Sequence, residues 1–202
     1  MNLLRKSLIL SLVLAGVSSL PAAGNQSDHP AAAIVKSYLE AVVKQDWKAA
    51  AEMLLPSSLE RRKEQMILAV KNSSTMTEEA AKLNMLGVKD VKELEALSPQ
   101  AAYVVDRKAV HDRMKIPDEA LKRKIDTLKI NILGLCPEEE GKIMHAVVRT
   151  KQETPDTLIE ELLLISLIQD KVDAKKWLVV PDMQQPLTTP LKPLEAAPKP
   201  VK

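Results

Sequence analysis

The chain changes character near residue 115. Before this point, apolar residues recur every three or four positions, which is the spacing of amphipathic helices. After it, runs rich in Ile, Val and Leu alternate with short turn-forming segments. Helices that precede a meander of strands indicate an α+β domain in which a helical layer covers an antiparallel sheet. The sequence therefore predicts a helical N-terminal half packed on a curved, four-stranded antiparallel meander sheet, in a single α+β domain over residues 25–181.

Proline and capping residues locate the predicted helices. Pro30 suits the first turn of a helix. Ser57 with Glu60, and Thr75 with Glu78, have the spacing of a capping box, in which two side chains satisfy the free amides at a helix start. The predicted helices span residues 30–54, 57–71, 75–87, 90–97 and 98–114, followed by one further helical turn or a loop at 117–119.

Alternation of apolar and polar residues locates the predicted strands. Leu128, Ile130 and Ile132 alternate with polar residues, as expected of a sheet with one covered face. The run 162–165 is apolar at every position, which suits a central strand. The last segment, 182–202, is rich in proline and is predicted to be a flexible tail, because it has little to bury. The predicted strands span residues 125–136, 142–151, 157–169 and 175–181.

The first 24 residues have the pattern of an export signal. Arg5 and Lys6 precede an apolar stretch over residues 7–20, and the small residues that follow suit cleavage after Ala23 or Gly24. The alternative is an uncleaved membrane anchor, for which the apolar stretch is short. We therefore expect a periplasmic or secreted protein with no stable membrane insertion after signal cleavage.

Charge and aromatic content exclude some partners. Removing residues 1–24 takes away two of the 29 basic residues and none of the 27 acidic ones, so the charges of the remaining chain balance. A neutral chain has no general attraction to nucleic acid or to anionic membranes. The chain has two Tyr, two Trp and no Phe, too few rings for a platform that stacks bases. We expect no nucleic-acid partner.

Two stretches resemble a known superfamily. The end of the first predicted helix, Val43–Ala50, and the closing strand, Lys176–Val180, are similar to the nuclear transport factor two-like superfamily. The middle of the chain, at 86–100, resembles exported bacterial members with no assigned activity. The resemblance implies an α+β cone in which a curved sheet wraps a long helix and leaves a pocket. Because the superfamily contains enzymes and non-enzymes, it does not determine the activity.

The best candidate for a ligand site lies on the second predicted strand. His145 and Arg149 are four residues apart, so strand alternation places them on one face. At the open mouth of the cone, they would bind an anionic ligand. The alternative is a plain exposed sheet face.

Other residue types that carry chemistry give weaker patterns. His111 shares a helix face with Arg107, either as an acid–base pair or as part of a solvated surface. Cys136 has no predictable base beside it, so a thiol at a strand end is expected. Glu138–Glu140 either face water or bind calcium weakly. The three His are too scattered for zinc, and no phosphate loop or nucleophile elbow occurs. No catalytic residue, metal or cofactor is predicted.

These patterns leave several functions open. The favoured hypothesis is a non-catalytic module that binds a small ligand or a protein partner through the cone pocket or the sheet face. The alternative is an isomerase, dehydratase or hydrolase with an Asp/His pair in the cone. A third hypothesis is a structural subunit whose tail docks on an envelope partner. A strand face rich in Leu and Ile is also compatible with a homodimer.

Overall fold

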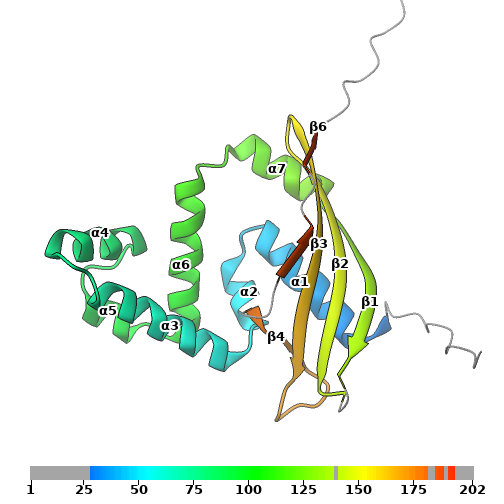
Figure 1. The fold of residues 1–202 in the computed structure, drawn as a ribbon, viewed down its shortest axis with the longest axis horizontal. Coiled ribbons are helices and arrows are strands. Elements are labelled where there is room, and N and C mark those ends of the chain that lie inside the picture. Colours follow the sequence, from blue (N-terminus) through cyan, green and yellow to red (C-terminus); the bar gives the residue numbers. More distant parts are fainter. Residues whose placement is uncertain (1–27, 139–140, 182–184, 189–190, 194–202) are drawn as a thin grey trace, which may run out of the picture.

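A computed structural model describes residues 28–138, 141–181, 185–188 and 191–193. In this part of the chain, helices come first and the sheet follows (Figure 1). Helix α1 lies along one face of the sheet, and α3 to α6 form a lobe on the side of α1 and α2 away from the sheet. The helices are α1 (Pro30–Val43), α2 (Trp47–Glu52), α3 (Pro56–Lys71), α4 (Met76–Leu86), α5 (Val91–Ala96), α6 (Pro99–Met114) and α7 (Asp118–Thr127).

The sheet is antiparallel, with the order β1-β2-β3-β4. Two further short strands, β5 and β6, pair with β3 beyond the end of β4. This arrangement confirms the predicted α+β class, with the helices N-terminal to a meander. The strands are β1 (Lys129–Pro137), β2 (Ile143–Glu153), β3 (Thr157–Gln169), β4 (Trp177–Val179), β5 (Gln185–Thr188) and β6 (Leu191–Pro193).

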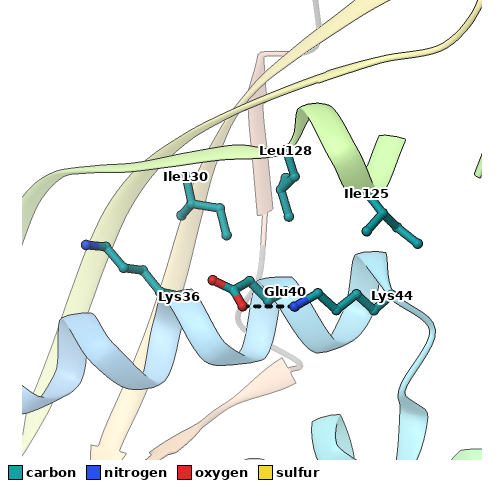
Figure 2. A pocket seen from close by; sticks show the side chains of 6 residues that line it. All are labelled: Lys36, Glu40, Lys44, Ile125, Leu128 and Ile130. Carbon is teal, nitrogen blue, oxygen red and sulfur yellow. Dashed lines mark hydrogen bonds and ion pairs between the residues drawn. The ribbon is translucent and has the colours of Figure 1, made fainter. Parts of the chain in front are cut away.

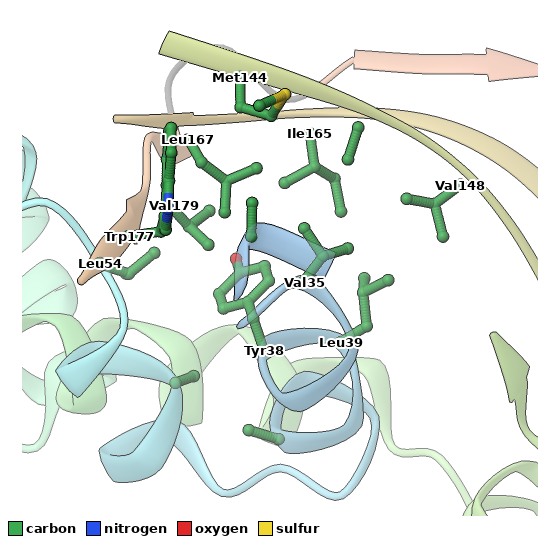
Figure 3. Close-up of a cluster of buried hydrophobic side chains, with 14 of the residues drawn as sticks. Val35, Tyr38, Leu39, Leu54, Met144, Val148, Ile165, Leu167, Trp177 and Val179 are labelled. Carbon is green, nitrogen blue, oxygen red and sulfur yellow. The ribbon is translucent and has the colours of Figure 1, made fainter. Parts of the chain in front are cut away.

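One sheet face is buried against α1. Along β2, the buried residues Met144, Ala146 and Val148 belong to the main core, so the alternate residues lie on the outer face. Figure 3 shows how α1 inserts Tyr38 and Leu39 beneath this inner face. The core contains Val35 and Leu54 from the helical half, Ile165, Leu167, Trp177 and Val179 from the sheet, and smaller residues between them.

Strand β4 joins the two halves of the molecule. On one side it pairs with β3, and on the other Val179 forms a bridge to Leu54, just after α2. The amide of Val179 donates to the carbonyl of Met53 at 2.8 Å, and the amide of Leu55 donates to the carbonyl of Val179 at 2.9 Å. Because these bonds pair buried backbone groups, they hold the helical half in register with the sheet.

The helical lobe has a small core of its own. This core consists of Val70 of α3, Leu83 of α4, Leu94 of α5, and Val88 in the link between α4 and α5. Helix α6 packs against both α2 and α3 and thereby connects the lobe to the rest of the domain. No helix in the described part of the chain is long and apolar enough to cross a bilayer.

The predicted first helix is in fact two helices. The chain turns at Gln45, which has a φ of 60°, and α2 then begins after Asp46. The Asp46 carboxylate accepts a hydrogen bond from the amide of Ala49 at 3.0 Å, so the aspartate caps a new helix start. The apolar stripe continues across the break, which is why periodicity alone predicted one helix.

Two other predicted boundaries are wrong for local reasons. Helix α3 begins at Pro56 and has no side-chain cap, so Ser57 does not open it. Residues 125–127 belong to α7 rather than to the first strand. Leu121 and Ile125 have helical spacing, and the strand alternation begins only beyond them. The predicted caps Thr75 and Asp90 are confirmed, since they accept hydrogen bonds from the amides of Glu78 and Glu93.

The predicted export signal, residues 1–24, lies outside the described residues. The predicted flexible tail lies largely outside them too. Its described parts, 185–188 and 191–193, are paired with β3, a contact that the sequence did not predict.

Thr150 provides a test of inner-face packing. Its hydroxyl is buried and has no hydrogen-bond partner among the described residues. An unpaired buried hydroxyl costs free energy that an isosteric methyl does not, so Thr150→Val should raise the free energy of unfolding by about 1 kcal/mol. Urea denaturation measures this change. The opposite change on the same strand face, Val148→Thr, should lower the free energy of unfolding by a similar amount. A loss of stability in Thr150→Val would show that the Thr150 hydroxyl is hydrogen-bonded.

Candidate functional site

One flank of α1 carries a stripe of charged residues. Lys36, Glu40 and Lys44 are spaced four residues apart and therefore lie on the same side of the helix. The apolar stripe of Val35 and Leu39 is buried against the sheet, which leaves the charged stripe along the edge of the core. The fold thus positions three long charged side chains beside the start of β1.

An apolar wall faces this stripe. Ile125 of α7, Leu128 in the link to β1, and Ile130 of β1 are half-buried and point toward the charged side chains (Figure 2). Between the two sides lies a cavity of about 340 Å³, open to solvent, which we call the α1 groove. Its lining consists of Lys36, Glu40, Lys44, Ile125, Leu128 and Ile130.

The last turn of α7 positions this wall. The hydroxyl of Thr127 donates to the carbonyl of Arg123 and accepts from the amide of Glu153 at 2.8 Å. Arg123 also pairs with the Glu153 carboxylate at 3.0 Å. These contacts attach the end of α7 to the end of β2, so the apolar wall is held by the sheet as well as by its own helix.

The charges in the α1 groove are not equivalent. The Glu40 carboxylate pairs with the Lys44 ammonium at 3.2 Å. Lys36 has no ion pair among the described residues. It is also less exposed than either of the other two charged side chains. The groove therefore offers one uncommitted ammonium next to an apolar wall. Such a site attracts a molecule with an anionic group and a hydrocarbon part.

His145 and Arg149 share one strand face, as the alternation predicts, but it is the outer face. The inner face of β2 packs on α1, so neither residue lines the α1 groove. The prediction that they lie at the mouth of a cone pocket does not match this placement, because the sequence does not reveal which face of β2 the helix covers. Whether they bind a ligand stays a prediction.

Both residues have partners on the outer face. The Nδ1 atom of His145 lies 2.9 Å from the Ser166 hydroxyl, and its Nε2 atom lies 2.8 Å from the Glu138 carboxylate. Arg149 lies 3.4 Å from the Glu160 carboxylate, which also pairs with Lys151 at 3.3 Å. The carboxylate partners neutralise part of the charge that an anion would meet here.

Cys136 lies opposite His145 in the ladder between β1 and β2 and is exposed. The structure therefore places a base near this thiol in the sheet, a neighbour that the sequence did not predict. Both ring nitrogens of His145 are hydrogen-bonded to other groups. The imidazole is thus held by Ser166 and Glu138 rather than aimed at the thiol.

On α6, the important acidic residue is Asp106. Arg107 pairs with Asp106 at 2.8 Å, and Arg62 of α3 donates to the same carboxylate oxygen from Nε at 2.9 Å. Burial alone would raise the pKa of Asp106, but the hydrogen bonds from Arg107 and Arg62 outweigh it and hold this pKa below its usual value. This cluster attaches the lobe helix α3 to α6. His111 has no part in it.

Beside this cluster lies a buried tyrosine. Tyr103 of α6 is almost fully buried, and its burial and its hydrogen bond with Tyr38 of α1 raise the pKa of its hydroxyl. The guanidinium of Arg107 lies 5.9 Å from the centre of the Tyr103 ring. Both tyrosines are thus part of the junction between α1 and α6, which is a structural role.

The remaining candidates stay apart. His29 caps α1 through the amide of Ala31, and its ring meets the edge of Trp177 with centroids 5.6 Å apart. Among the described residues, no three His, Cys, Asp or Glu side chains come together as metal ligands.

The sequence contained part of the signal for the α1 groove. The four-residue spacing of Lys36, Glu40 and Lys44 was visible, but it suggested only the solvent side of a helix. Ile125 was assigned to a strand, so its helical position facing α1 could not be predicted.

Comparisons of the chain with protein-family models, with curated proteins and with solved structures found no match in any of the three. Membership of the nuclear transport factor two-like superfamily therefore stays a prediction.

Proposed function

We propose that this protein is an exported, non-catalytic binding module that holds a small amphipathic anion in the α1 groove. The ligand class follows from the lining. A carboxylate or phosphate head would bind the ammonium of Lys36, and a hydrocarbon chain would pack on Ile125, Leu128 and Ile130. The observation that carries the proposal is the single uncommitted lysine beside a half-buried apolar wall.

The energetics support an amphipathic ligand over a purely polar one. A lysine in contact with water gains little from an exposed ion pair, about 0.2–1 kcal/mol. Removing apolar area from water contributes about 25 cal/mol per Å², so the hydrocarbon part would provide most of the affinity. The charge would then select anions among molecules of similar shape.

The enzyme alternative has less support. An acid–base site in an apolar cavity needs a carboxylate and a His within hydrogen-bond reach. The six residues that line the α1 groove include one carboxylate, Glu40, and no His. The pair formed by His145 and Glu138 lies on the outer sheet face, away from the groove. For these reasons an enzyme with an Asp/His pair is kept only as the alternative hypothesis.

A protein partner remains a second proposal for the outer face. Val147, Leu162 and Leu164 lie side by side on β2 and β3, half-buried and next to the ion pairs of Glu160. An aliphatic strip with a charged border is typical of an interface, and a homodimer through this face remains our expectation. A periplasmic or secreted location likewise rests on the pattern of residues 1–24.

The role of Lys36 can be tested with decanoate as the probe. Lys36→Gln should weaken decanoate binding by up to about fivefold, because an ion pair in contact with water contributes about 0.2–1 kcal/mol. Calorimetric titration measures the affinity. Lys44→Gln is the matched control on the same helix face, and its effect should be smaller because Glu40 already pairs with Lys44.

Decanol tests the contribution of the hydrocarbon chain separately from that of the charged head group. It has the same hydrocarbon length without the charge, so Lys36→Gln should leave its affinity unchanged, whereas Leu128→Ser should weaken both probes. Equal affinity of the parent protein and Lys36→Gln for decanoate would overturn the assigned role of Lys36.

A further inference from the structure

Three separate strands, β4, β5 and β6, cover the edge of β3 that faces away from β2. Strand β3 has 13 residues, and β4 pairs only with its last three, Leu167–Gln169. The tail then returns along the same edge: β5 pairs at Leu162–Leu164, and β6 pairs at Thr157–Ile159. The chain thus uses its own C-terminal segment to cover most of an edge that would otherwise present unpaired backbone groups.

This cover is short and irregular. The pairing with β5 shifts register between Leu162 and Leu163, and no described residue of the tail is paired with Glu160 or Glu161. Each tail strand has four residues or fewer. A longer, continuous strand would pair with this edge more completely.

The edge of β3 is complementary to itself. In an antiparallel pair of two β3 strands with a two-fold axis at Leu162, opposed residues have side chains on the same face. Glu160 would then lie opposite Leu164, and Glu161 opposite Leu163, so that no two carboxylates are opposed. An axis at Glu160 or Glu161 would oppose like charges. The charge pattern therefore excludes these two registers and allows the register centred on Leu162.

Little in the domain itself blocks such pairing. The amide of Val180 donates to the carbonyl of Ser166, so the edge is occupied from Ser166 onward. Release of β5 and β6 would therefore leave the stretch 157–165 available. This stretch contains the run Leu162–Ile165 and no proline. A long apolar edge of this kind is a recognised template for pairing between chains.

We infer that the β3 edge, residues 157–165, is a pairing site for the β3 edge of a second copy, and that β5 and β6 occupy it in the monomer. Release of the tail joins two sheets into one continuous sheet across a two-fold axis at Leu162. Retention of the tail keeps the edge closed.

The test compares the chain with and without residues 182–202 by light scattering after size-exclusion chromatography. The shortened chain should form a dimer at concentrations where the full-length chain is monomeric. Leu162→Lys and Leu162→Glu in the shortened chain should each return it to the monomer, because like charges are then opposed at the axis. Mixing these two variants should restore a dimer, which contains one copy of each.

Three results would overturn the inference: a folded shortened chain that stays monomeric, a dimer that tolerates both charges at position 162, or variants that do not combine on mixing. Where the shortened chain does not fold, the full-length Thr188→Pro/Lys192→Pro variant replaces it. Thr188 and Lys192 pair with Leu162 and Leu158, so these prolines remove two amide donors from the tail. This variant should therefore dimerise, and a monomer with unchanged circular dichroism would contradict the proposal.

Discussion

Leu167→Ala should lower the free energy of unfolding by about 3 kcal/mol, within the range of about 2–5 kcal/mol for truncating a buried leucine side chain. Leu167 is 0% exposed and lies in the main core with Val35 of α1 and Val179 of β4. Figure 3 shows it between the sheet and α1. Three elements meet at this side chain, so the surrounding structure cannot close around the lost atoms without moving a helix or a strand. Chemical denaturation followed by circular dichroism measures the change.

Leu68→Ala is the control for this prediction. Leu68 is 55% exposed on α3, so the same chemical change should alter the free energy of unfolding by no more than about 0.5 kcal/mol. Equal effects of the two substitutions would mean that the interface between α1 and the sheet is not the principal core of the protein.

Asp106→Asn should lower the free energy of unfolding by about 2 kcal/mol. The Asp106 side chain is 15% exposed and pairs with both Arg62 and Arg107. Removing its charge leaves two guanidinium groups facing one neutral amide. Breaking a fully buried pair costs about 3–5 kcal/mol, and the partial exposure of Arg62 at 36% reduces this figure. Thermal or urea unfolding of the two proteins at neutral pH measures the difference.

The pH dependence of this effect has a definite sign. Because the pKa of Asp106 is lowered in the folded protein, its contribution to stability is fully present above the usual aspartate pKa of about 4. The contribution is lost as the pH falls through the lowered value. The difference between the parent protein and Asp106→Asn should therefore shrink in acid. Asp112→Asn, an exposed change on the same helix, should show no such difference, and a constant effect of Asp106→Asn at every pH would contradict the ion-pair explanation.

Local signals predicted the helical lobe well. The caps Thr75, Asp90 and Ser98 accept hydrogen bonds from amides three residues later, and α4, α5 and α6 begin directly after them. Capping is determined by residues next to each other in the chain, so a sequence shows it directly. The strands β2 and β3 were predicted for a similar reason, since alternation and turn residues are local.

Contacts between distant segments could not be predicted in the same way. Arg62 and Asp106 are 44 positions apart, and nothing in either neighbourhood indicates the other. The face of β2 on which His145 lies depends on where α1 packs. The break at Gln45 leaves the apolar periodicity intact, so only the geometry of Asp46 reveals it.

The α1 groove could not be predicted, because it depends on contacts between distant segments and on a helix boundary that the sequence did not reveal. Its charged side was visible as spacing along one helix, but its apolar side comes from α7 and β1, about 90 residues later in the chain. The assignment of Ile125 to a strand removed the one residue that would have indicated a helix beside this groove.

The most direct test of the proposed function is a titration with decanoate that is followed through methyl signals in nuclear magnetic resonance. We expect the methyl groups of Ile125, Leu128 and Ile130 to shift together and to saturate. The methyl groups of Val147 and Leu162, on the outer sheet face, should not move. Shifts confined to the outer face would instead assign binding to the surface of His145 and Arg149. The absence of any saturable shift would contradict the assignment of the α1 groove as a binding site for an amphipathic anion.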